Sequence, residues 1–462
     1  MYDAIVVGAR ISGSATAMLL AEKGYRVLLL DRATFPGGKA AATNLVHPPG
    51  VARLQRWGLL DAVKATGCPP IHSYGLQSGP VELMARLPAA EGVAEAYSPA
   101  RRKLDEILLE GAVKAGAELR EQVAVRELLT DDTGTVTGIR GELPHRTPVT
   151  EHARVVIGAD GANSTVARLV GAEKYDAAPV LNKSHWSYWS GLPHDGRVRT
   201  YRHNNKHCFT WPTHDGLTIV GVALPVKDFR ATDDADRDRT VIAAFDEVDP
   251  AFAERLRRTE RVDSWMTGAV PNFFRRSHGP GWALVGDAGY TRDPITAAGI
   301  TDALRGGELL AGAVDRGLSG RTGLDQALAG YARDRDDLVR GHYWYTRDHA
   351  MIANHNREEI EIIRAMTRSP AHGTGMVGMF ATVVPPAEFY SAQNIHALFD
   401  HVAPGLEPGW KIRMVRWMVR GAPRHLPPVT RLADRLIAAN LGSMGRYLLH
   451  SSARGGAPRR AA

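Results

Sequence analysis

Short apolar runs alternate with longer helical stretches at the start of the chain. The first run, Ala4 to Val7, leads through a glycine-containing turn into an Ala-rich stretch that ends before Gly24. A second apolar run, Val27 to Leu30, follows. Apolar runs this short are typical of strands buried on both faces, whereas the longer stretch between them predicts a helix. The pattern therefore predicts an N-terminal β-α-β unit with parallel strands.

The same alternation continues and predicts further elements of both kinds. In chain order they are a helix over 101–115, a strand over 118–129, a hairpin turn at 131–134, buried strands at 154–157 and 282–285, and helices starting near 236, 299 and 324. Residues 366–408 are interrupted by Pro, Gly and His and give no clear assignment. Strands that alternate with helices favour an α/β fold.

Residues 184–226 have a different pattern, in which apolar and aromatic residues recur at every second position. Gly196 and the pair Asp215-Gly216 fit the turns between such strands. An antiparallel sheet inserted in an α/β chain indicates a second domain.

The composition is that of an ordinary globular protein, with 462 residues, 44% hydrophobic and 23% charged. Cys68 and Cys208 lie far apart in the sequence, which argues against a disulfide framework or a cysteine-built metal site, and no metal is expected. The chain opens on its first strand and has no apolar run of about 18 residues, so we expect neither a signal peptide nor a membrane span. The expected location is cytoplasmic.

The net charge of +7 comes from the C-terminal tail. From Lys411 onward the chain has eleven Lys and Arg residues and one acid, Asp434, whereas the remainder has 46 basic and 49 acidic residues. A helix over 412–420 would place apolar and basic residues in neighbouring stripes. Such a helix either docks on the protein with its charges solvated or contacts an anionic membrane surface or an acidic carrier protein. No repeated aromatic-basic pattern supports nucleic-acid binding.

The turn after the first strand, Gly8-Ala9-Arg10-Ile11-Ser12-Gly13, and the acid after the second, Asp31, form a dinucleotide-binding fingerprint. A pyrophosphate would bind at the helix N-terminus, and the acid would accept hydrogen bonds from a ribose hydroxyl. Arg10 replaces the middle glycine, where it could lie along a phosphate. An ordinary strand-helix turn that binds nothing is the alternative interpretation.

Two further strand ends carry glycine and acid. Asp160-Gly161 follows the strand at 154–157, and Gly286-Asp287 follows the strand at 282–285. Each pair alone fits an ordinary turn. Because ligands bind at the carboxyl ends of parallel strands, the three ends together predict one extended ligand.

In this set of motifs the chain resembles the FAD-dependent group A flavoprotein monooxygenases, the para-hydroxybenzoate hydroxylase-like flavoproteins, over about residues 1–335. The segment from Gly8 to Gly13 with Asp31 matches that family's ADP-binding segment, and Arg101 matches an arginine that contacts FAD. The segment Gly158 to Arg168 matches the Asp-Gly motif associated with both FAD and NAD(P)H. The segment Gly286 to Gly299 matches the Gly-Asp motif, although this chain has Gly-Tyr where the family more often has Ala-His.

The resemblance implies FAD as the cofactor. The residues expected to bind it are Gly8, Arg10, Ser12, Gly13, Asp31, Arg32, Arg101, Val123, Asp160, Gly161, Gly286, Asp287, Pro294, Gly299 and Ile300. Asp287 is expected on the ribityl chain and Pro294 beside the flavin ring. The helix that begins at Gly299 would aim the backbone amides of Gly299 and Ile300 at the N1 and C2-carbonyl edge, where reduced flavin carries negative charge.

The expected architecture is α/β, a Rossmann-like FAD-binding domain with an inserted antiparallel β-sheet substrate domain and a helical C-terminal region. The boundaries are 1–73, 94–175 and 276–335 for the FAD-binding domain, 74–93 and 176–275 for the substrate domain, and 336–462 for the C-terminal region with its basic tail.

The resemblance also implies a reaction. Family members reduce FAD with NAD(P)H as a transient co-substrate and transfer one oxygen atom of O₂ from a flavin hydroperoxide to the substrate. The chain has no second dinucleotide fingerprint, in agreement with transient NAD(P)H binding. The expected activity is hydroxylation or epoxidation of a fairly large apolar or aromatic small molecule, in secondary metabolism.

The inserted sheet supplies the candidate substrate residues, Trp186, Tyr188, Phe209 and Trp211. Because alternate strand residues point to opposite faces, about half of the aromatic residues would line a pocket over the flavin. Each of them could equally be a core aromatic. The sequence identifies no catalytic acid or base, and the candidates are Tyr290, His207 and Arg292.

Three other functions stay open. A flavin-dependent halogenase would have a Trp-x-Trp-x-Ile-Pro segment, which this chain lacks, although Lys39 can be compared with a halogenase lysine. A reductase of prenyl double bonds, similar to geranylgeranyl reductases, is suggested by the loop from Phe35 to Lys39, although the usual cysteine-glycine pattern is missing. The third is a flavin-binding protein without turnover, which acts in assembly or sensing.

Overall fold

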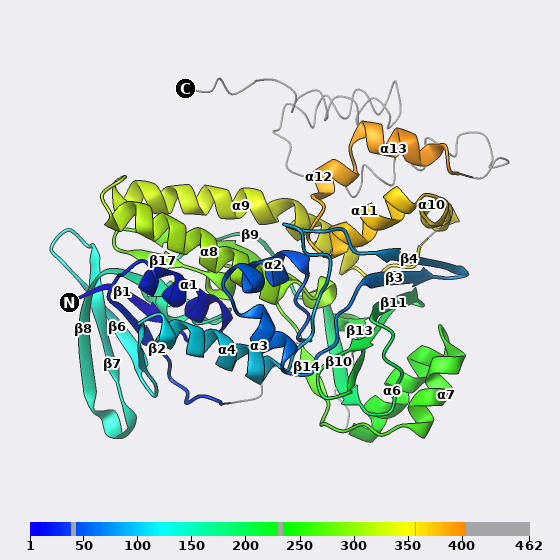
Figure 1. The fold of residues 1–462 in the computed structure, drawn as a ribbon, viewed down its shortest axis with the longest axis horizontal. Coiled ribbons are helices and arrows are strands. Elements are labelled where there is room, and N and C mark those ends of the chain that lie inside the picture. The colour runs from blue at the N-terminus through cyan, green and yellow to red at the C-terminus, as the bar shows by residue number, and fades with distance from the viewer. Residues whose placement is uncertain (38–42, 230–233, 356, 403–462) are drawn as a thin grey trace.

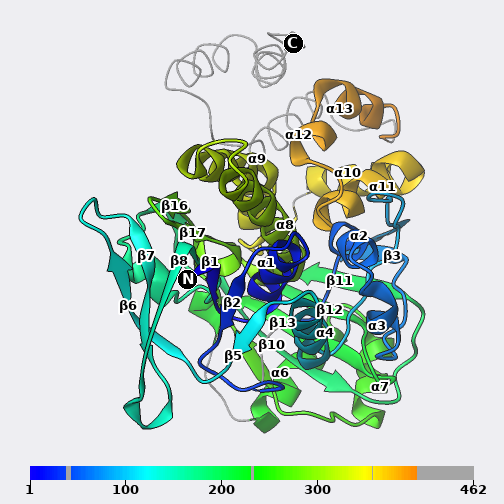
Figure 2. The ribbon, with the colours of Figure 1, turned by 60° about the vertical axis from the view of Figure 1, so that its left-hand side comes forward.

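A computed structural model describes residues 1–37, 43–229, 234–355 and 357–402 of the chain. The predictions about Lys39 and about the tail from Lys411 onward fall outside these residues. Figures 1 and 2 show two sheets side by side, with helices packed on both and a further group of helices above one edge. The predicted α/β class is confirmed.

The first sheet is built on parallel strands, as predicted. Its order is β16-β17-β8-β1-β2-β5, and β7 and β6 continue from β8 as antiparallel strands. The strands are β1 Tyr2–Val7, β2 Val27–Leu30, β5 Glu118–Arg120, β6 Ala124–Thr130, β7 Val136–Glu142, β8 Pro148–Gly158, β16 His278–Gly279 and β17 Trp282–Leu284. The parallel pairs join β5 to β2, β2 to β1, β1 to β8 and β8 to β17.

Both faces of the first sheet are buried, which explains its continuous apolar runs. Ala4 and Val6 of β1 belong to the core formed with α1 (Ile11–Ala21), α4 (Arg101–Lys114) and α8 (Gly299–Leu318). Ile5 and Val7 belong to the core on the opposite face, which β6 and β7 cover. Since successive side chains of a strand point to opposite faces, every position of β1 must be compatible with burial.

The prediction of a single strand over 118–129 is wrong. Residues 118–120 form β5 and pair with β2, whereas residues 124–130 form β6 and pair with β7. Gln122 between them has a φ of 61°, a left-handed conformation that interrupts an extended strand. The apolar pattern continues through the interruption because both strands contribute to a core, with Leu119 of β5 on one face of the sheet and Val125 of β6 on the other.

The second sheet has the order β14-β10-β13-β12-β11-β3-β4. Its strands are β3 Ser73–Ser78, β4 Val81–Arg86, β10 Asn182–Trp189, β11 Arg197–His203, β12 Lys206–Pro212, β13 Thr218–Pro225 and β14 Met266–Gly268. It is antiparallel as predicted, except that β3 runs parallel to β11. Helices α6 (Asp234–Asp246) and α7 (Pro250–Arg258) cover one face, where Val220 and Val222 pack against Phe245. Residues 73–86 thus join the inserted sheet, while the domain boundaries themselves stay a prediction.

A small third sheet and further helices complete the described chain. The sheet has the order β18-β15-β9, and its strands are β9 Lys174–Ala178, β15 Asn272–Arg275 and β18 Tyr290–Thr291. The remaining helices are α2 Pro48–Arg56, α3 Leu60–Lys64, α5 Thr165–Leu169, α9 Leu324–His349, α10 Arg357–Arg368, α11 Pro370–Phe380, α12 Pro386–Phe389 and α13 Ala392–Phe399. Short 3₁₀ turns occur at Pro144–Arg146, Val226–Asp228, Gly286–Ala288 and Pro294–Thr296.

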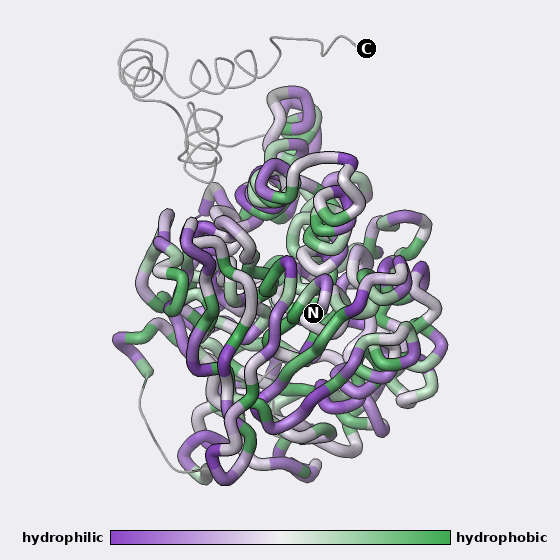
Figure 3. Tube along the Cα trace, turned by 90° about the vertical axis from the view of Figure 1, so that its left-hand side faces the viewer, coloured by the Kyte–Doolittle hydropathy of each residue, from purple (hydrophilic) through white to green (hydrophobic). Residues whose placement is uncertain are grey.

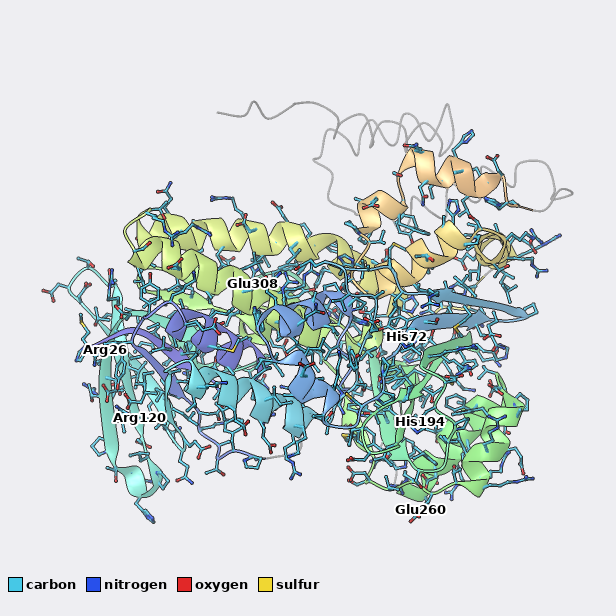
Figure 4. All side chains as sticks on the ribbon, in the orientation of Figure 1. Arg26, His72, Arg120, His194, Glu260 and Glu308 are labelled. Carbon is cyan, nitrogen blue, oxygen red and sulfur yellow. The ribbon has the colours of Figure 1, made fainter. Side chains whose placement is uncertain are left out.

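Ion pairs on the surface join α2 to α8. Arg53 Nη2 lies 2.9 Å from Glu308 Oε2, and Arg56 pairs with the same carboxylate. Glu308 is labelled on α8, next to α2, in Figure 4. Beneath these pairs, Val51 and Leu54 of α2 share a buried core with Ile300 and Leu304 of α8, whose N-terminal part lines the site described below.

Residues 366–402 of the segment that gave no clear assignment from sequence fold mainly as helices over the second sheet. Leu83 of β4 shares a core with Ile362 and Met366 of α10 and Met379 of α11. Figure 3 shows apolar segments, in green, in the interior of the molecule and polar segments, in purple, at its periphery. Among the helices that the structure describes, none combines the length and the apolar character needed to cross a bilayer.

Candidate functional site

A cavity of about 690 Å³ lies at the carboxyl ends of the parallel strands. Val7 at the end of β1, Leu30 at the end of β2, Ala159 after β8 and Gly286 after β17 all line it. This is the edge at which ligands bind in open α/β sheets. The three strand ends that the sequence singled out therefore meet at one cavity.

All but one of the residues predicted to bind the cofactor line this cavity. They are Gly8, Arg10, Ser12, Asp31, Arg32, Arg101, Val123, Asp160, Gly161, Gly286, Asp287, Pro294, Gly299 and Ile300. The exception is Gly13, where a Cβ would lie 1.7 Å from the Gly8 carbonyl oxygen. Gly13 is required for close packing of α1 on the turn that precedes it, and not for a surface that faces the cavity.

The arginine in the middle of the fingerprint is accommodated by an acid on α4. Arg10 precedes the first turn of α1, and its Nη1 lies 4.0 Å from Asp105 Oδ2. Arg101 Nε donates to Asp105 Oδ1 at 2.9 Å. Asp105 is buried and does not line the cavity, yet it holds two cationic side chains that do. Sequence reasoning missed this residue, although its position four residues after Arg101 on a predicted helix was a usable signal.

The acid at the end of β2 connects the glycine turn to the second strand. Asp31 Oδ2 accepts a hydrogen bond from the Ala9 amide at 2.8 Å, and Oδ1 accepts one from the Ala33 amide at 2.9 Å. An ionised carboxylate has about four acceptor sites, so both oxygens keep capacity for a ribose hydroxyl.

Asp160 has a structural role in addition to its place in the cavity wall. Its carboxylate accepts hydrogen bonds from Ser164 Oγ and from the amides of Thr165 and Val166, at the first turn of α5. Gly161 follows with a φ of +80°, and a Cβ there would meet no heavy atom within 4 Å. The Asp-Gly pair thus ends β8, orders α5 and leaves open space beside the cavity.

The Gly-Asp motif packs tightly on one side and faces the cavity on the other. Gly286 has a φ of +60°, and a Cβ there would lie 2.5 Å from Ser12 Oγ. The Asp287 side chain is open to the cavity. The surrounding protein raises the pKa of Asp287 to about 6, mainly because the cavity wall around it limits hydration of the carboxylate, while Arg101 lowers the pKa and Asp302 raises it.

The N-terminus of α8 opens into the cavity. Ala297 adopts a left-handed φ of 51° and turns the chain into the helix at Gly299. A Cβ at Gly299 would meet no heavy atom within 4 Å, so this glycine leaves room for a flat group to approach the helix end. The first amides of a helix have no partner within the helix and attract negative charge.

Two of the three catalytic candidates line the cavity. The Tyr290 hydroxyl is buried and has no hydrogen-bond partner within the described residues. Burial raises its pKa well above the usual value, so it stays a neutral donor. Arg292 Nη1 donates to Thr346 Oγ1 at 2.9 Å, and its Nη2 lies 2.9 Å from Asp302 Oδ2. Both side chains can therefore position a ligand, and neither is an available base.

The structure places the third candidate, His207, away from this cavity. It lies on β12, packed against the ring of His349 with 5.5 Å between ring centroids. Burial, and then the nearby Arg202, lower the pKa of His207 to about 3. It is therefore a neutral residue of the core.

None of the four candidate substrate aromatics lines the cavity. Trp186, Tyr188, Phe209 and Trp211 share the inner face of the second sheet, where residues 377 and 381 of the C-terminal region pack against them. Tyr188 contacts the cavity wall through one residue, because its hydroxyl accepts a hydrogen bond of 2.7 Å from Asn44 Nδ2 and Asn44 lines the cavity.

Two polar residues that line the cavity were missed by sequence reasoning. Asn44 has a φ of 62°, and its Oδ1 is buried without a hydrogen-bond partner among the described residues. Asp293 is buried, and Asn182 Nδ2 donates to both of its carboxylate oxygens at 2.9 Å. Burial raises the pKa of Asp293 to about 7. The acid immediately before Pro294 was a usable signal, whereas no local pattern identifies Asn44.

The described residues contain no group of three or more His, Cys, Asp or Glu side chains that could hold a metal ion. Cys68 and Cys208 are both buried free thiols.

Comparison with known proteins gives the family. The model of the family described as "FAD binding domain" matches residues 1–341. A digeranylgeranylglycerophospholipid reductase of Methanocella arvoryzae is 26% identical over 324 residues, which cover 67% of this chain and 76% of that protein. Tetracycline 7-halogenase of Kitasatospora aureofaciens is 23% identical over 351 residues, which cover 65% of this chain and 61% of that protein.

A solved structure shows the same fold. PqsL, a probable FAD-dependent monooxygenase from Pseudomonas aeruginosa, superposes with a TM-score of 0.64 at 20% identity and covers 82% of this chain and 99% of its own. At this identity the likeness establishes the fold alone. The family match is consistent with the predicted resemblance to the group A flavoproteins, and the chain belongs to the FAD-binding domain family of FAD-dependent oxidoreductases.

Proposed function

We propose that this protein is an FAD-dependent monooxygenase that uses NAD(P)H and O₂ to hydroxylate or epoxidise a fairly large apolar or aromatic small molecule in secondary metabolism. One observation carries the proposal. A single cavity passes the ends of β2, β1 and β17 and finishes at the N-terminus of α8, beside Tyr290 and Pro294.

The residues present fit FAD along this cavity. Asp31 and Val123 would hold the adenosine part, and Ser12 with Arg101 the pyrophosphate. Asp287 would contact the ribityl chain. The flavin ring would approach the N-terminus of α8, where the missing side chain of Gly299 leaves open space.

Bound FAD supplies the electron transfer and oxygen activation of the reaction. The protein's own contribution is orientation and charge. The first amides of α8 would stabilise negative charge on the bound flavin, and the Tyr290 hydroxyl holds a proton that it can donate in a hydrogen bond. Asp293, with a pKa of about 7, can hold or release a proton near neutral pH.

The substrate would contact the cavity from the side of the second sheet. Tyr188 and Asn44 connect the inner face of that sheet to the cavity wall. We therefore retain Tyr188 as a substrate contact and assign Trp186, Phe209 and Trp211 to the core of the sheet. A cytoplasmic location, the absence of nucleic-acid partners, and contact of the basic tail with a membrane surface or carrier protein rest on the sequence alone.

One alternative has support of its own. The digeranylgeranylglycerophospholipid reductase of M. arvoryzae matches two thirds of this chain, which favours reduction of prenyl double bonds as the second candidate. The match to tetracycline 7-halogenase keeps a halogenase as the third. All three functions would use the flavin cavity proposed here and would differ in what happens after flavin reduction.

The test begins with the purified protein. It should carry, or take up, a flavin with the absorption of bound FAD, and NADH or NADPH should bleach that absorption. With a candidate substrate under ¹⁸O₂, a monooxygenase incorporates one labelled oxygen atom. A reductase yields a product with two added hydrogens and no label, and a halogenase requires halide. A protein that stays colourless after incubation with FAD would contradict the proposal.

A further inference from the structure

A buried ion pair lies at the first turn of α8, where the flavin ring is placed. Arg292 Nη2 and Asp302 Oδ2 are 2.9 Å apart, and the two side chains are 4% and 7% exposed. Both residues line the cavity. Arg292 comes from the loop that leads to Pro294, and Asp302 is the acid of the first helical turn.

The carboxylate of Asp302 is electrostatically unfavourable for a reduced flavin. The N-terminus of a helix carries the equivalent of about half a positive charge. A full negative charge three residues after Gly299 outweighs that partial charge unless a cation balances it. The influence of Asp302 reaches the cavity, because it is one of the groups that raise the pKa of Asp287, after the larger effect of burial.

Arg292 is held in place from the opposite side. Its Nη1 donates to Thr346 Oγ1 on α9 at 2.9 Å, and Thr346 Oγ1 lies 3.2 Å from Thr296 Oγ1. The backbone carbonyl of Thr296 contacts a ring nitrogen of His47 at 2.9 Å. The guanidinium is thus fixed by α9 and by the same loop that carries Pro294.

Other charged groups do not replace this balance. Arg305, also on α8, is largely buried, and burial lowers its pKa, while Asp302 raises it and Arg292 lowers it further. The Tyr290 hydroxyl is neutral. In the part of the chain that the structure describes, the cation that forms an ion pair with Asp302 is Arg292.

We propose that Arg292 is a positioning residue that neutralises Asp302, so that the N-terminus of α8 stays positive toward the flavin and favours its reduced form. This inference rests on the proposed placement of FAD. The competing explanation is that the pair only fastens the loop to the helix, in which case its removal affects folding and leaves the flavin unchanged.

The experiment measures the reduction potential of bound FAD in holoprotein by equilibration with a reference dye, together with thermal unfolding. Asp302→Asn removes the negative charge and should shift the equilibrium about tenfold toward reduced flavin, roughly 30 mV for a two-electron couple. Arg292→Met leaves the charge of Asp302 without its cation and should shift the equilibrium in the opposite direction. The double variant R292M/D302N should stay within about twofold of wild type.

Two further variants serve as controls. Arg292→Lys keeps the charge and should stay near the wild-type potential. Asp176→Asn removes the acid of a more exposed ion pair, in which Arg340 Nη1 lies 2.7 Å from Asp176 Oδ2, and neither residue lines the cavity. This variant should not change the potential.

Equal potentials in wild type, D302N and the double variant, with changes in thermal unfolding alone, would overturn the inference. If R292M fails to fold, D302N and R292K decide the question. A wild-type protein that binds no FAD overturns the proposed function and removes the basis of the inference. A wild-type protein that binds and reduces FAD, with no shift in D302N, overturns the inference alone.

Discussion

The carboxyl ends of the first sheet and the inner face of the second sheet are both rich in residues that the sequence marks as functional, yet they have different roles. At the strand ends of the first sheet, residues as far apart as Gly8 and Gly299 line one cavity. On the inner face of the second sheet, Trp186, Phe209 and Trp211 are buried against the C-terminal helices and do not reach that cavity. Glycines and acids in these turns are needed to bind a ligand, whereas large aromatic residues on a strand are needed first to fill the core.

The largest effect is expected from Gly299→Asp, which tests whether the cavity at the N-terminus of α8 binds the flavin. The new carboxylate would occupy the open space at the helix end and repel a negatively charged flavin edge. We expect FAD affinity to fall by about a hundredfold or more, measured by flavin fluorescence titration. Gly312→Asp, on the same helix but outside the cavity wall, is the matched control and should retain flavin. A yellow G299D protein would refute the placement.

Phe209→Ala tests whether the aromatic residues on the inner face of the second sheet serve to stabilise the fold. Phe209 is 6% exposed and stacks on Trp211 with 5.2 Å between ring centroids. Its truncation should lower the free energy of unfolding by about 3–5 kcal/mol, measured by urea denaturation, and leave FAD affinity unchanged. Phe252→Ala, at a partly buried site on α7, should cost less. Loss of substrate turnover in F209A without loss of stability would show that this face of the second sheet belongs to the substrate site.

Asp293 links the two regions, because Asn182 of β10 donates to both of its oxygens. Burial raises its pKa from 3.8 to about 7, so the unfolded chain releases the proton at lower pH than the folded protein. The unfolding free energy that Asp293 contributes is therefore present below about pH 4 and falls as pH rises to about 7, by up to about 4 kcal/mol.

Asp293→Asn should lack this decline, so urea denaturation of wild type and variant between pH 4 and 8 should diverge in favour of the variant. Asp195→Asn gives the opposite sign, because Arg199 holds the pKa of Asp195 below its usual value despite burial. Parallel pH profiles for wild type and D293N would contradict the prediction.

The smallest effect is expected from Tyr188→Phe. This change leaves Asn44 Nδ2 without its acceptor at the cavity edge, which costs about 1–3 kcal/mol of folding free energy. If Tyr188 contacts substrate, KM should rise while FAD affinity stays unchanged. An unaltered KM would confine substrate binding to the other walls of the cavity.

Local sequence was sufficient to predict a site residue where its residue type is required by one short-range feature. Gly8, Asp31 and Gly299 are recognisable from local sequence, because turns, strand ends and helix starts are short-range features, and all three line the cavity. The same reasoning was insufficient for Gly13, which is selected by packing, and for Asp105, whose value depends on holding Arg10 and Arg101 together.

The sequence by itself determined the α/β class, the parallel β-α-β start, the inserted sheet and the glycines and acids at the strand ends that line the cavity. Only the tertiary structure decided that the C-terminal helices cover the aromatic face of the second sheet, and that Arg292 and Asp302 meet in a buried pair. The physical reason is the sequence separation between the residues that interact. Strand, turn and helix signals arise from neighbours along the chain, whereas burial and ion pairing depend on segments that only folding brings together.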